Sequence, residues 1–193
     1  MTVNRSLPLP LLLVALAGCG AEADGPNAPN TAAYSGPVNV RLDKFKDGDV
    51  RNEAFDADKS INTESGNPYG VFLQDARRAL GRDPAAVVVD RVTFTMGSDT
   101  RGVTAFEQVF TGSLVVYLAS STTTVNVGSA DNPTGAGPVE VNVNATRATL
   151  DPIQRDLLNG SFKLGIRVPA APGRPRSFDV KVATTVYFRA LAL

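Results

Sequence analysis

Apolar and polar residues alternate along much of the chain, and this period of two restricts the fold more than any other feature. The stretch 139–144 alternates without a break, and residues 162–168 and 178–188 repeat the pattern. Successive side chains of a strand point to opposite faces, so each stretch predicts a strand with one buried face. Weaker patterns of the same kind predict strands at 38–42, 87–96, 106–118 and 120–127. These strands follow one another without intervening helices, which favours antiparallel pairing.

We therefore expect a mainly β fold of about seven strands. The pattern fits an antiparallel β-sandwich, immunoglobulin-like or jelly-roll-like, and it also fits a flattened barrel. One helix is expected near residues 68–80, because Asn67 and Pro68 form a favoured N-cap and first turn and Gly81 supplies a stop. Its apolar stripe would be Val71, Phe72, Ala76, Ala79 and Leu80. A short second helix is expected near 152–158.

Three polar stretches interrupt the predicted strands and are expected to be loops: residues 49–66, 130–138 and 169–175. Loops carried by a rigid sandwich are frequent binding elements, so these three are the candidate contact surfaces for a partner. The threonine-rich stretch 120–127 suits a strand at the edge of a sheet, where only one side is paired. Residues 122–127 could then dock a partner by strand addition.

The N-terminus has the composition of an export signal. One positive charge, Arg5, precedes a short apolar run that is far below the length needed to cross a bilayer. This run ends in Leu16, Ala17, Gly18 and Cys19. These four residues resemble the lipobox of bacterial lipoproteins. The resemblance implies cleavage between Gly18 and Cys19 and attachment of lipid to the sulfur of Cys19.

The resemblance also implies an organisation and a location. Residues 1–18 would be the lipoprotein signal peptide, 19–37 the lipidated cysteine and a flexible linker, and 38–193 a single β-rich domain. The acylated Cys19 would hold the protein to the bilayer of a bacterial cell envelope. Gly20, rather than Asp, follows the cysteine, which favours the outer membrane, on its periplasmic or surface face.

Composition argues against several classes of function. The chain has 19 Lys and Arg against 19 Asp and Glu, so no basic surplus points to nucleic acid. It has no histidine and no tryptophan, and its one cysteine is Cys19. The commonest general base and metal ligand is therefore missing, and no thiol remains once Cys19 is lipidated. We expect no cofactor and no enzymatic activity.

One acidic stretch is a candidate calcium site. Asp56, Asp58, Ser60, Asn62 and Glu64 place oxygen atoms on alternate residues, as calcium-binding loops do. Ile61 stands where the sharp turn of an EF-hand needs glycine, Asn67 stands where its bidentate glutamate belongs, and Lys59 adds a positive charge. The alternative is a solvated acidic loop, and this alternative is favoured.

The sequence leaves three functional hypotheses open. The first is a non-catalytic binding or structural module that meets an envelope protein or a glycan. The second is an accessory subunit of an envelope assembly, and the third is a hydrolase that uses paired carboxylates. The first is preferred, because no residue pattern beyond the lipobox carries identifiable chemistry.

Overall fold

The computed structural model describes residues 32–192. Eight strands make up the domain: β1 (Ala33–Lys46), β2 (Ala54–Ile61), β3 (Ala86–Met96), β4 (Ser113–Ala119), β5 (Thr124–Asp131), β6 (Val139–Val143), β7 (Phe162–Pro169) and β8 (Asp179–Leu191). The helices are α1 (Pro68–Leu80), α2 (Arg147–Leu150) and α3 (Gln154–Asn159), with single 3-10 turns at Asp47–Asp49, Phe106–Gln108 and Asp151–Ile153. The mainly β prediction is confirmed.

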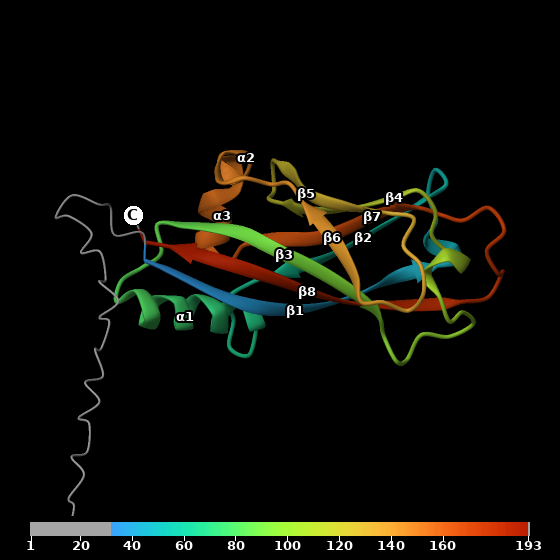
Figure 1. Ribbon diagram of the computed structural model, residues 1–193, viewed down its shortest axis with the longest axis horizontal. Coiled ribbons are helices and arrows are strands. Elements are labelled where there is room, and N and C mark those ends of the chain that lie inside the picture. The colour runs from blue at the N-terminus through green and yellow to red at the C-terminus, as the bar shows by residue number, and fades with distance from the viewer. Residues whose placement is uncertain (1–31, 193) are drawn as a thin grey trace, which may run out of the picture.

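All strand pairs are antiparallel, in the order β1-β8-β3-β6-β5-β4-β7-β2. The first strand pairs with the eighth, the second with the seventh, the third with the sixth and the fourth with the fifth, as in a long hairpin rolled up on itself. This is the topology of a jelly roll. Figure 1 shows β1, β8 and β3 in one layer, with β2, β7 and β4 behind them.

Strand β6 joins the two layers. Val139 and Val141 pair with β3, whereas Asn142 and Val143 pair with β5, so the strand leaves one layer and enters the other. The opposite side is different, because β1 and β2 lie next to each other but form no backbone ladder. The sheet is therefore a flattened barrel that is open along one side.

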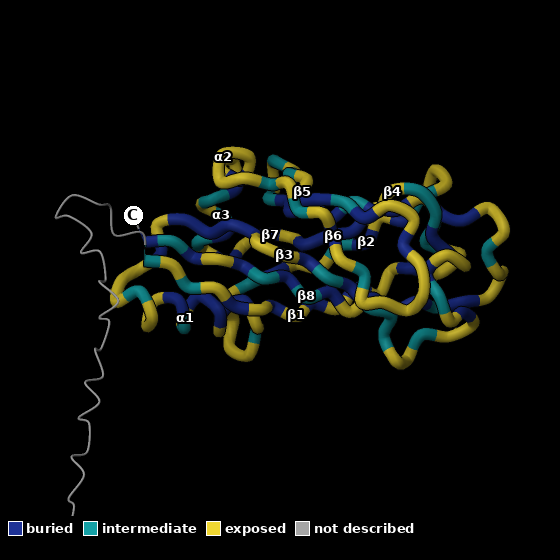
Figure 2. The backbone as a smooth tube through the Cα atoms, in the orientation of Figure 1, coloured by how far each residue is buried: buried dark blue, intermediate teal, exposed yellow. Residues whose placement is uncertain are grey.

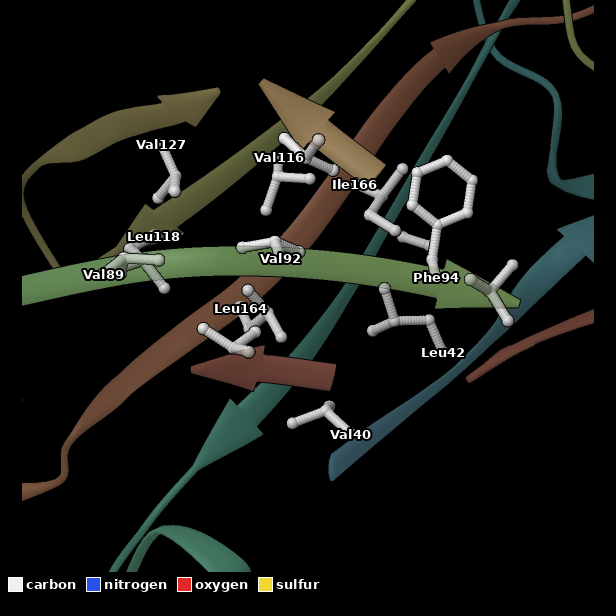
Figure 3. Close-up of a cluster of buried hydrophobic side chains, with 14 of the residues drawn as sticks. Val40, Leu42, Val89, Val92, Phe94, Val116, Leu118, Val127, Leu164 and Ile166 are labelled. Carbon is white, nitrogen blue, oxygen red and sulfur yellow. The ribbon is translucent and has the colours of Figure 1, made fainter. Parts of the chain in front are cut away.

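The core lies between the two layers. Figure 3 shows Val40, Leu42, Val92 and Phe94 of one layer facing side chains such as Leu164 of the other. These residues occupy the inward positions of alternating strands and are at most 8 % exposed. The alternation continues through β8, where Val180, Val182, Val186 and Phe188 are all fully buried or nearly so. Burial of this many branched and aromatic side chains is the main stabilising contribution.

Helices α1 and α3 close one end of the barrel. The ring of Tyr69 is fully buried between Phe162 and Phe188, with ring centroids 4.9 and 5.0 Å away. Its hydroxyl donates a hydrogen bond to the carbonyl of Leu157 at 2.9 Å, which links α1 to α3. Burial of the ring raises the pKa of Tyr69 far above its ordinary value. The hydroxyl remains a donor at every physiological pH.

The helix bounds were predicted correctly for α1, but its buried face was not. Asn67 caps the helix by accepting a hydrogen bond from the N–H of Tyr69, and Gly81 ends it in the left-handed conformation. The buried face is Tyr69, Gly70, Phe72, Leu73 and Ala76, whereas Val71 is 50 % exposed. The predicted stripe was rotated because the aromatic Tyr69 at the start of the helix anchors it to the barrel end.

Three further sequence predictions need correction, whereas the short helix predicted near 152–158 is confirmed. Residues 49–66 are not one long loop, because they contain β2, whose inward Phe55, Ala57 and Ile61 are buried. Strand β1 begins at Ala33 rather than at 38, since residues 33–37 continue the ladder with β8. The predicted strand at 106–118 starts only at Ser113. The short helix predicted near 152–158 is α3, preceded by a turn and by α2, which Thr146 caps.

The threonine-rich stretch belongs to β5, which has a neighbour on both sides only at its C-terminal half. Strand β5 pairs with β4 on one side, and Gly128 and Ser129 pair with β6 on the other. Gly128 allows this close approach, since a Cβ there would lie 2.3 Å from the carbonyl oxygen of Asn142. Residues 124–126 pair only with β4, so this part of the predicted docking edge at 122–127 has no strand partner on the β6 side. The two strands at the ends of the sheet order are β1 and β2.

Candidate functional site

The predicted lipidation and cleavage residues, Cys19 and Gly18, lie outside the described residues. The described chain enters the fold at Ala32, whose carbonyl accepts a hydrogen bond from the N–H of Ala192. Tyr34 then contacts Phe72 of α1, with ring centroids 5.8 Å apart. Within residues 32–192 no helix is both long and apolar enough to cross a bilayer.

The calcium candidates do not converge. Asp56, Asp58 and Ser60 lie on β2 and share its outward face, while Asn62 and Glu64 follow the strand. The side-chain oxygen of Asn62 accepts hydrogen bonds from the backbone N–H of Glu64 and from the side-chain amide of Asn67. No group of three or more metal-ligating acids, cysteines or histidines exists in the described part of the chain. Asn62 instead supports the turn that leads into α1.

Asp56 belongs to a polar cluster on the outer face of β2, β7 and β4. It pairs with the guanidinium of Arg167 at 2.8 Å and accepts a hydrogen bond from the hydroxyl of Tyr117 at 2.6 Å. The Tyr117 ring lies flat over Gly165, and the Arg167 guanidinium is 5.6 Å from the ring centroid. Desolvation and the neighbouring Asp56 carboxylate raise the pKa of the Tyr117 hydroxyl. The cluster ties three strands together.

Asp58 is shared between two lysines. Its carboxylate lies 3.7 Å from the ammonium of Lys44 on β1 and 3.4 Å from that of Lys163 on β7. Asp56 and Asp58 are thus each in contact with cationic side chains.

Two of the three predicted loops meet at the end of the barrel far from Ala32 (Figure 1). There the connection between β1 and β2 and the connection after β7 surround a groove of about 800 Å³. Its lining residues are Val50, Asn52, Glu53, Ala54, Thr111, Pro169, Ala170, Pro172 and Arg174. We call this the loop groove. Figure 2 shows that this end of the molecule is largely exposed.

Backbone hydrogen bonds hold the loop groove in shape. The N–H of Ala170 donates to the carbonyl of Glu53 at 2.8 Å, and the N–H of Thr111 donates to the carbonyl of Pro169 at 3.0 Å. Arg174 pairs with Asp47 at 3.0 Å on one rim. The groove is therefore held in shape by the backbone, and its lining combines apolar residues with the polar Asn52, Glu53 and Arg174.

The third predicted loop packs beside this groove without lining it. The N–H of Gly135 donates to the carboxylate of Glu107 at 2.7 Å, and the N–H of Phe106 donates to the carbonyl of Gly135 at 2.8 Å. Residues 132–138 thus brace the turn at Phe106–Gln108. They support the loop end rather than form its contact surface.

A second, smaller groove lies along the open side of the barrel, between β1 and β2. Its volume is about 170 Å³, and its lining residues are Val38, Asn39, Val40, Arg41, Asp43, Lys59, Ser60, Ile61, Asn67 and Pro68. We call this the seam groove. Sequence reasoning missed it, because it is formed by residues of two strands whose neighbouring edges stay unpaired. The sequence feature that could have indicated this groove is Lys59, which interrupts the apolar alternation of β2.

The charged groups on the outer face beside the seam groove are arranged in pairs. Arg41 forms ion pairs with Asp43 and with Asp99, and the hydrogen bond from Arg41 lowers the pKa of Asp99. Asp179 lies between Lys181 at 2.8 Å and Lys46 at 3.5 Å. Desolvation alone would raise the pKa of Asp179, but the hydrogen bond and charge of Lys181, helped by Lys46, lower it.

Comparison with known proteins adds little. No family model matches the sequence, and no curated protein matches it. A solved structure titled Desmodium yellow mottle tymovirus is similar in structure, with 14 % sequence identity and a TM-score of 0.34. The similarity covers 100 % of this chain and 95 % of that one. At this TM-score it carries no argument about function, and the jelly-roll assignment rests on the strand order above.

Proposed function

We propose that this protein is a lipid-anchored lipoprotein of the bacterial cell envelope, held by Cys19, whose β domain binds a partner without catalysis through the loop groove. The partner would be an envelope protein or a glycan. The outer membrane is the proposed location.

The observation that carries the proposal is the position of the loop groove relative to the point where the chain enters the fold. The chain enters at Ala32, and β1 then runs for 14 residues, about 45 Å, before it reaches the connection that forms the groove. A lipid on Cys19 would hold the Ala32 end toward the bilayer. The loop groove would then face away from the membrane, toward a partner.

The state of the acidic side chains supports a non-catalytic role. Asp56 and Asp58, which share a face of β2, are each engaged by cations, and the sequence contains no histidine. The lining of the loop groove mixes apolar and polar groups, as a recognition surface does.

The anchor is tested by mass spectrometry of the protein purified from membranes. We expect a mature N-terminus at Cys19 that carries a diacylglyceryl group. The variant Cys19→Ser should lose the lipid and leave the membrane fraction. A native N-terminus elsewhere, or membrane retention of the serine variant, would contradict the proposed anchor.

The binding surface is tested by photocrosslinking in intact cells. A photoreactive phenylalanine analogue placed at Asn52, in the groove, should give one discrete crosslinked species. The same analogue at Arg155, an exposed residue of α3, is the matched control and should give none. Equal crosslinking from both positions, or none from Asn52, would refute the loop groove as the contact surface.

A further inference from the structure

The open side of the barrel exposes two strand edges of the kind that accept an added strand. Strands β8, β3, β6, β5, β4 and β7 each have a neighbour on both sides, whereas β1 and β2 have one each. The two edges run side by side. The ammonium of Lys44 on β1 lies 3.7 Å from the carboxylate of Asp58 on β2. Alternate residues of each edge therefore direct N–H and C=O groups toward the gap without a ladder partner.

Lys59 occupies an inward position of β2. It stands directly opposite the buried Leu164 of β7, and the inward residues on either side of it, Ala57 and Ile61, are buried. Lys59 itself is exposed, because the barrel is open at this point. Its ammonium group has no hydrogen-bond or ion-pair partner within residues 32–192. An inward cation on an open strand edge is thus available to an acidic group.

The floor and rims of the seam groove fit a polypeptide strand. Val38, Val40 and Ile61 line the bottom and are at most 8 % exposed, and Asn39 and Ser60 supply polar groups on the rims. The volume of about 170 Å³ holds roughly one side chain. The backbone of an added strand would then lie along the edge of β2 and place one side chain in the groove.

We propose that the free edge of β2, residues 57–61, accepts an extended segment of a partner protein that carries an acidic side chain opposite Lys59. The segment adds an antiparallel strand along β2, and its acidic side chain enters the seam groove beside Lys59. This surface is separate from the loop groove, so the inference goes beyond the proposed function and does not depend on it.

Two physical contributions select such a segment. Its backbone satisfies the unpaired groups of β2. Its acid forms a cross-strand pair with Lys59, at Cβ separations of about 4.5–5.5 Å in such pairs. A basic residue at the same position would face a like charge, which gives the site its specificity.

The test uses two fluorescein-labelled, capped peptides, Thr-Val-Thr-Asp-Thr-Val-Thr and the same peptide with Lys in place of Asp. Fluorescence anisotropy measures their affinity for the wild-type protein, for Lys59→Glu and for Arg155→Glu. The Arg155 variant changes the net charge equally but lies on α3. We expect wild-type protein and the Arg155 variant to prefer the acidic peptide by about tenfold. Lys59→Glu should reverse the preference.

Hydrogen exchange locates the bound peptide. The acidic peptide should slow amide exchange within residues 57–61 of the wild-type protein, and far-UV circular dichroism should show that both variants stay folded. The proposal is overturned by absence of binding at millimolar peptide, by protection elsewhere, or by a preference that Lys59→Glu leaves unchanged. In each of these cases Lys59 serves only to keep the open edges from pairing with other chains.

Discussion

Replacing Gly165 with alanine tests the arrangement of the outer-face cluster on β2, β7 and β4. A Cβ at this position would lie 2.1 Å from Cζ of Tyr117 and 2.4 Å from its hydroxyl oxygen. No real contact is that short, so the ring must move. The Tyr117 side chain is only 6 % exposed and its hydroxyl is bound to Asp56, so the ring has no free alternative position.

The expected cost follows from what the ring loses. Breaking a hydrogen bond to a charged acceptor costs about 1.5–3 kcal/mol, and crowding a packed site costs about 1–3 kcal/mol. Replacing glycine reduces the entropy of the unfolded chain, which offsets about 0.4–1 kcal/mol. We expect Gly165→Ala to lower the free energy of unfolding by about 3 kcal/mol, with a fall in Tm of roughly 6–12 °C.

Urea unfolding followed by far-UV circular dichroism measures this change, since the chain has no tryptophan for a fluorescence signal. The double variant with Tyr117→Val supplies the control, because removing the ring removes the clash. The cost of Gly165→Ala should then fall below about 1 kcal/mol in the Tyr117→Val background, which indicates strong coupling. A wild-type-like Gly165→Ala, or additive effects in the double variant, would refute the reasoning.

Three further predictions concern stability. Thr184 is fully buried at an inward position of β8, and its hydroxyl has no hydrogen-bond partner within residues 32–192. Thr184→Val should therefore raise the free energy of unfolding, measured in urea, by about 1 kcal/mol. A lower free energy of unfolding in the variant would show that the hydroxyl has a partner. Tyr69→Phe leaves the Leu157 carbonyl without its hydrogen bond and should lower the free energy of unfolding by about 1–2 kcal/mol in the same assay. An unchanged free energy of unfolding would mean that this hydrogen bond does not stabilise the fold. The lowered pKa values of Asp99 and Asp179 mean that their contribution is complete above the ordinary value of 3.8 and is lost as pH falls through the lower native values. Urea midpoints of the wild type should therefore drop more steeply below about pH 4 than those of Asp179→Asn, and parallel pH profiles would contradict the assigned ion pairs.

The prediction of helix α1 succeeded because its signals are local. Asn67, Pro68 and Gly81 lie within a few residues of the backbone groups that they satisfy, so their effect does not depend on the rest of the fold. The face that α1 buries was predicted less well. That face depends on Tyr69 reaching Phe162 and Phe188, which are remote in sequence.

Strand β2 shows why one strand escaped prediction. Its alternation is interrupted by Lys59 at an inward position, and the pattern then resembles a polar loop. The interruption is tolerated because β2 has an open side where the ammonium reaches solvent. Only the pairing of the strands reveals that open side, and pairing involves contacts between segments far apart along the chain.

The sequence by itself determined the mainly β character, most strand positions and the ends of α1, and the lipid anchor at Cys19 stays a prediction from the sequence. Each of these depends on side-chain alternation or on short motifs, which are local properties. The tertiary structure alone decided the jelly-roll order, the loop groove and the seam groove. These features require pairs such as Asp56 with Arg167, 111 residues apart, and no local pattern specifies which distant segments will meet.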